Sequence, residues 1–129
     1  MTKNKTNKKQ FILFKKTVQK WVDFYGLVDW RLQILHDDID DIDASAVAIC
    51  QTDFENKTCV IALATQFDDN TSMEDEDIIE YAFHEVQHLL FAKITHLAEQ
   101  RCIKYSDIDE EEHHLIHIFE NKILPNIKV

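Results

Sequence analysis

Residues 82–101 have the sequence AFHEVQHLLFAKITHLAEQR. This segment is the most informative part of the chain for both fold and function. Its apolar residues recur every three or four positions, which is the period of an amphipathic helix. The apolar side chains in and beside it share one side of the helix: Ile79, Phe83, Val86, Leu89, Leu90 and Leu97. His84 and His88 fall on the opposite side. The pattern predicts one long helix, capped at Thr71 or Ser72 and reaching about residue 101, with two imidazoles on its polar face.

The same segment contains the motif HExxH, formed by His84, Glu85 and His88. Two histidines four residues apart share a helix face and can bind one metal ion. The glutamate between them lies beside the metal, where it can take a proton from a water molecule that the metal activates. In a chain of this composition, chance alone gives about 0.03 such motifs. The favoured interpretation is a metal site with His84 and His88 as ligands and Glu85 as the catalytic base.

A catalytic zinc site also needs a third protein ligand and one open position. The last predicted helix, residues 108–124, offers one. Its apolar face consists of Leu115, Ile116, Phe119 and Ile123. Extending that face by one turn toward the N-terminus reaches Glu112. Burial of a carboxylate on such a face destabilises the fold unless the carboxylate forms an ion pair or binds metal. Glu112 is therefore the predicted third ligand, with His113 as the next choice, while Glu110 and Glu111 are predicted to point into solvent.

The preceding part of the chain predicts one helix and three strands. Residues 9–26 show helical spacing of apolar side chains, and Gly26 sits where a helix commonly ends. Three β-prone runs follow, at residues 30–35, 46–50 and 58–63. The last two are close enough to form a hairpin. The order predicts a single α+β domain over residues 1–129 with a small, mostly antiparallel sheet, preceded by a flexible basic tail at residues 1–8.

Composition limits the partners that are expected. The formal net charge is −10, and an acidic surface repels a phosphate backbone, so nucleic-acid binding is not expected. The three cysteines form no CxxC pair, which disfavours both a disulfide framework and a cysteine zinc knuckle. No apolar run is long enough for a signal peptide or a membrane span, so membrane attachment is not expected and the cytoplasm is the default location.

The segments at 82–101 and 110–125 resemble the minimal HExxH metallopeptidases of phages and mobile elements, a gluzincin-like group similar to the ImmA/IrrE proteases. The resemblance extends to the N-terminal helix and to the strand that begins at residues 30–32. It implies a minimal zincin-like fold, one Zn²⁺ ion and hydrolysis of a protein or peptide substrate. In ImmA/IrrE-like proteins a glutamate follows on the next helix, ahead of a run that ends in proline, and Glu112 takes that place here.

The enzyme implied by this resemblance is a zinc metallopeptidase in which a zinc-activated water attacks the peptide bond. A further donor would stabilise the oxyanion that forms. Four side chains are candidates for that donor: His113, His117, Tyr81 and Tyr105. A substrate peptide can lie along an edge strand of the small sheet.

Two other classes of function stay open. A non-catalytic zinc-binding interaction protein, for example a phage effector that binds a host protein through its acidic surface, needs the same metal site. Only an assay for chelator-sensitive cleavage separates it from a peptidase. A nucleic-acid-associated metalloprotease of the SprT-like kind is disfavoured by the acidic charge. The sequence predicts no oligomeric state.

Overall fold

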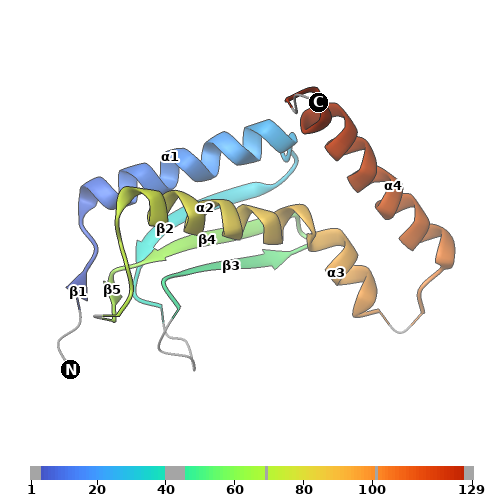
Figure 1. The fold of residues 1–129 in the computed structure, drawn as a ribbon. Helices are drawn as coiled ribbons and strands as arrows, with labels where there is room; N and C mark the ends of the chain where they lie inside the picture. Colours follow the sequence, from blue (N-terminus) through green and yellow to red (C-terminus); the bar gives the residue numbers. More distant parts are fainter. Residues whose placement is uncertain (1–3, 40–45, 69, 101, 127–129) are drawn as a thin grey trace.

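The computed structural model describes residues 4–39, 46–68, 70–100 and 102–126. In these ranges helices and strands combine as the sequence predicts, so the α+β class is confirmed (Figure 1). The helices are α1 (Lys8–Tyr25), α2 (Asp75–Leu90), α3 (Ala92–Ala98) and α4 (Tyr105–Lys122), followed by the 3-10 turn η1 (Leu124–Asn126). The strands are β1 (Asn4–Lys5), β2 (Arg31–Asp37), β3 (Ala48–Asp53), β4 (Thr58–Ala64) and β5 (Gln66–Phe67).

Helix α1 begins and ends at residues that suit helix termini. The Asn7 side chain accepts a hydrogen bond from the Gln10 backbone N–H at 2.8 Å, and the Gln10 side chain accepts one from the Asn7 N–H. This reciprocal pair is a capping box. Gly26 follows the last turn with a φ of 71°, a left-handed conformation that glycine adopts without a Cβ clash. The predicted end of the helix at Gly26 is confirmed.

The segment before α1 differs from the flexible tail that the sequence predicted for residues 1–8. Strand β1 pairs antiparallel with β5, and the buried Thr6 hydroxyl donates to the Ala64 carbonyl oxygen at 2.7 Å. These bonds tie the start of the chain to the end of β4. Residues 1–3 of the predicted tail lie outside the described residues.

The three-stranded sheet has the order β2-β4-β3, with β2 parallel and β3 antiparallel to β4. The predicted hairpin between the second and third strands is confirmed, but the sheet is mixed rather than mostly antiparallel. Strand β4 is the most buried of the three, with Cys59, Ile61 and Leu63 on its inner face. An apolar strand of this kind is most stable at the centre, where both of its edges are paired and its inner face is covered. This order leaves β3 at an edge.

Helices α1 and α2 lie side by side over the inner face of this sheet (Figure 1). They supply most of the helical part of the core: Phe14, Val18 and Val22 from α1, and Ile78, Ala82, Val86 and Leu89 from α2. Burial of the α2 residues fixes the rotation of this helix about its axis, because turning it would expose several apolar side chains at once. The polar face of α2 is thereby held in one direction.

The long helix predicted from the central segment is in fact two helices. Helix α2 begins after Glu74, two or three residues beyond the predicted caps Ser72 and Thr71. At Phe91 the backbone leaves the α-helical region, with φ −90° and ψ 5°, and α3 continues in a new direction (Figure 1). Neither glycine nor proline marks this break, so periodicity alone did not predict it.

Candidate metal centre

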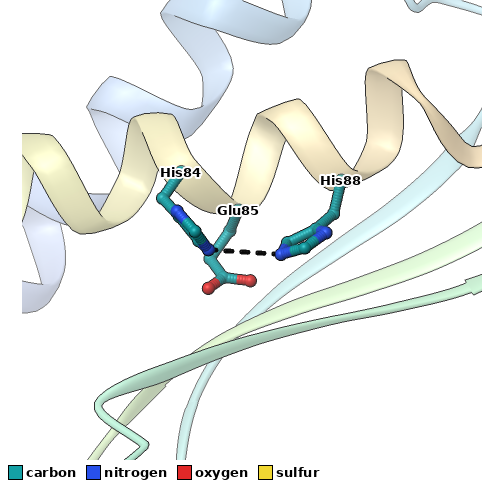
Figure 2. A group of neighbouring side chains, drawn as sticks. All are labelled: His84, Glu85 and His88. Carbon is teal, nitrogen blue, oxygen red and sulfur yellow. Dashed lines mark hydrogen bonds between the residues drawn. The ribbon is translucent and has the colours of Figure 1, made fainter.

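The middle of α2 carries the three side chains of the HExxH motif. His84, Glu85 and His88 project from the helix toward the sheet, as Figure 2 shows. On the opposite side of the helix, Val86 and Leu89 are at most 1% exposed, so the core holds the helix in this orientation. Because one helical turn separates the two histidines, their rings meet, and their Nε2 atoms are 3.2 Å apart.

The spacing of the two imidazoles fits a metal ion. Two nitrogens bound at about 2.0–2.1 Å to a tetrahedral ion are roughly 3.3 Å apart, close to the observed separation. One ligand atom from each of His84, Glu85 and His88 lies within 4.8 Å of the other two. In the part of the chain that the structure describes, this is the one group of three or more histidine, cysteine and acidic residues that is so close. The group could hold one metal ion.

Glu85 is the buried member of the group. Its side chain belongs to a residue that is only 7% exposed, and its carboxylate makes no hydrogen bond to the described residues. Burial raises the pKa of Glu85, and the neighbouring His84 opposes this shift to a smaller extent. The carboxylate opens onto a cavity, where water or a cation can solvate it. This feature is typical of functional sites.

A cavity of about 470 Å³ separates the motif from the edge strand β3. Its lining consists of His84, Glu85, His88, Ala92 and Thr95 from the helices and Ala48, Ile49, Cys50 and Thr52 from β3. Ala48, Cys50 and Thr52 alternate along the strand, so they share its inner face. No motif in the sequence marks these strand residues. Alternation could have shown that they share a face, but not that the face lies opposite α2.

The structure does not bring Glu112 to this group. Glu112 is exposed on α4, and the buried glutamate of that helix is Glu111, with 1% exposure. The prediction that Glu112 lies on the buried face and Glu111 in solvent is therefore wrong. The reason is that α4 packs through Leu115 and Ile118, whereas Ile116 is 40% exposed. The buried face of α4 is thus rotated about the helix axis, relative to the predicted face, by about 100°, the angle between successive residues of an α-helix.

Glu111 has its own partners, away from the motif. Its Oε1 lies 3.2 Å from His114 Nδ1. Its Oε2 lies 3.5 Å from Lys93 Nζ, an ion-pair distance that is too long for a hydrogen bond. Glu111 therefore joins α4 to α3 and takes no part in the cavity beside His84 and His88.

The other candidate side chains also lie elsewhere. The Tyr81 hydroxyl donates to the Ser72 carbonyl oxygen at 2.9 Å. His113 and His117 are exposed on α4, and Tyr105 is 81% exposed at its start. None of the four lines the cavity.

Comparison with known proteins identifies no relative: no family model matches the chain, and no curated protein or solved structure matches it significantly. Among the described residues, no helix is both long and apolar enough to cross a membrane. The residues of the HExxH motif and the cavity beside them are thus the basis on which a function can be argued.

Proposed function

We propose that this chain is a zinc-dependent metallopeptidase with Glu85 as its general base. The proposal depends on one observation, namely that two imidazoles and the carboxylate of a largely buried glutamate converge beside one cavity. The resemblance of the HExxH segment at residues 82–101 to the ImmA/IrrE proteases points to the same function, whereas Glu112, the ligand that the resemblance implied, lies outside the cavity. The free cysteines Cys50, Cys59 and Cys102 support a reducing compartment such as the cytoplasm.

In this proposal His84 and His88 hold the ion, and zinc suits a site built on imidazole nitrogens. When bound, zinc supplies Lewis acidity, which favours ionisation of water and polarises a scissile carbonyl. Glu85 accepts the proton of the attacking water and later donates a proton to the leaving amine. Its position next to His84 in sequence keeps its carboxylate beside the two imidazoles and at the lining of the cavity.

The substrate in this proposal is an extended peptide that binds along β3. Strand β3 lies at the edge of the sheet, so in the described structure one side of its backbone has no strand partner. A peptide can add to such an edge through main-chain hydrogen bonds. A peptide in that position would run past the cavity that Glu85 faces, because the inner face of β3 lines that cavity.

A zinc-binding interaction protein without turnover is the second candidate function. One observation keeps it open: α4 contributes no side chain to the cavity, so it does not supply the third ligand that a hydrolytic zinc site requires. A protein that only binds zinc and a partner does not need the open, activated coordination position that hydrolysis requires.

The test compares Glu85→Gln with Glu80→Gln, an exposed position on the same helix. Both variants and the wild type are loaded with Zn²⁺ and assayed with a fluorogenic peptide library, with and without chelator. We expect Glu85→Gln to retain zinc but to cleave about 100-fold more slowly or worse, and Glu80→Gln to behave as wild type. Undiminished, chelator-sensitive cleavage by Glu85→Gln would remove Glu85 from its role. Zinc binding with no cleavage by the wild type would favour the interaction protein.

A further inference from the structure

We propose that the thiol of Cys50, on strand β3, is the third protein ligand of the metal that His84 and His88 hold. The inference rests on the metal site of the proposed function and adds to it a ligand from the sheet. It assigns a role to a residue that lies outside the HExxH motif and far from it in sequence.

The first argument is the number of ligands. A zinc ion that activates water takes three protein ligands and leaves one position open. If Glu85 acts as the base, His84 and His88 supply only two. Apart from the motif, Cys50 is the one residue of the cavity lining that carries a strong zinc-binding group. The other polar side chains there are the hydroxyls of two threonines, which are weak ligands by comparison.

The second argument is the position of Cys50 in the sheet. It pairs in register with Ile61 of the central strand, whose side chain is fully buried, so both belong to the inner face of the sheet. That face lies opposite the polar side of α2, and Cys50 and Glu85 line the same cavity. A cation between β3 and α2 would therefore meet imidazoles from one side and sulfur from the other.

The third argument is that, among the described residues, the thiol of Cys50 has only one side-chain hydrogen-bonding contact to give up. Its Sγ now contacts Cys59 Sγ at 3.7 Å, and a contact between two thiols is weak. Cys50 is not in the group whose ligand atoms lie within 4.8 Å of one another, so ligation requires a change of its χ1 rotamer. Such a change moves a cysteine sulfur by about 3 Å. On binding, the thiol loses its proton to solvent and the sulfur donates an electron pair to the ion, so no oxidant or reductant is needed.

The experiment is a titration of the full-length protein with Co²⁺, a coloured probe for zinc sites. Cobalt bound to imidazole nitrogen gives visible d–d absorption, and a thiolate ligand adds an intense near-ultraviolet charge-transfer band. We expect this band in the wild type, its loss in Cys50→Ser and Cys50→Ala, and its retention in Cys59→Ala and Cys102→Ser. The affinity of the Cys50 variants should fall by about 100-fold or more, since loss of a residue that merely supports a ligand already costs 10–100-fold. Circular dichroism of each variant checks that it folds.

The outcomes separate this inference from the proposed function. Cobalt that binds through His84 and His88 without a charge-transfer band, or with a band that Cys50→Ala leaves unchanged, overturns the role of Cys50 and leaves the metal site intact. A wild-type protein that binds no cobalt and no zinc overturns both. If both Cys50 variants fold poorly, the variants of the other two cysteines decide: a charge-transfer band that survives in both Cys59→Ala and Cys102→Ser can come only from Cys50.

Discussion

Helices α2 and α4 each carry a pair of histidines four residues apart, yet only α2 forms a candidate metal centre. On α2, His84 and His88 have their Nε2 atoms 3.2 Å apart and line a cavity against β3. On α4, His113 and His117 are exposed, and each forms a pair with an acidic residue of its own helix. They do not belong to the group of side chains that could hold a metal.

The comparison shows what the spacing of histidines leaves undecided. A four-residue interval places two side chains on one face of a helix and nothing more. On α4 the neighbouring acids at Asp109 and Glu120 already provide partners for the imidazoles. On α2 the adjoining carboxylate is the buried Glu85, and the opposing element is a strand. A site therefore needs a second element opposite the helix face and no competing partners within the helix itself.

The largest expected effect is on zinc affinity, and it distinguishes the histidine pair of α2 from that of α4. Replacing His84 and His88 together with alanine should abolish Zn²⁺ binding, because it removes the two converging nitrogens. Replacing His113 and His117 together should leave zinc affinity within about threefold of the wild type, since exposed imidazoles with other partners are poor ligands. Isothermal titration calorimetry measures both. Equal losses of affinity in the two double variants would mean that α4 contributes to the site after all.

A smaller effect concerns the two neighbouring glutamates of α4. Glu111→Ala should destabilise the fold by about 1–3 kcal/mol, because it leaves Lys93 without its buried partner and opens space between α3 and α4. We place the value below that of a fully buried pair since the Lys93 side chain is 38% exposed and screened by water.

The matched control for this change is Glu112→Ala, which removes an exposed side chain and should alter stability by less than about 0.5 kcal/mol. Urea denaturation gives both values. The opposite ranking, with Glu112→Ala the more damaging, would mean that α4 buries the face that the sequence predicted.

The smallest expected effect concerns the protonation of His113. Its Nδ1–H donates to the Asp109 carbonyl oxygen at 2.8 Å, and this bond, followed by the charge of the Asp109 carboxylate, raises the pKa of His113. A raised folded-state pKa means that the protonated form stabilises the fold. This contribution is present below the pKa of the unfolded chain and is lost as the pH rises through the folded-state pKa.

Asp109→Asn should lower the pKa of His113 only in part, because the backbone hydrogen bond persists. An NMR titration of the histidine ring protons measures the shift. No change in the pKa would show that the carboxylate does not act on the ring, and the local pairing that distinguishes α4 from α2 would then need another cause.

Much of the site could be predicted because it lies within one helix. The motif, its spacing and the apolar residues around it fix which side chains share a face, and the structure agrees for His84, Glu85 and His88. The end of α1 at Gly26 and the hairpin of β3 and β4 could be predicted for the same reason, since local spacing and one special residue decide them. The rotation of α4 could not. That helix carries two apolar stripes, one with Leu115 and Ile118 and one with Ile116 and Phe119.

The sequence by itself therefore determined the helix that carries the candidate site and the direction of its histidines relative to its own apolar face. Only the tertiary structure decided which strand faces them, that β2 runs parallel to β4, and that Glu111 rather than Glu112 is buried. The physical reason is that periodicity relates residues within an element, whereas the choice among neighbours depends on which surfaces bury the most apolar area together. The position of Cys50 opposite the HExxH motif likewise follows from how the elements pack together and not from periodicity within one element.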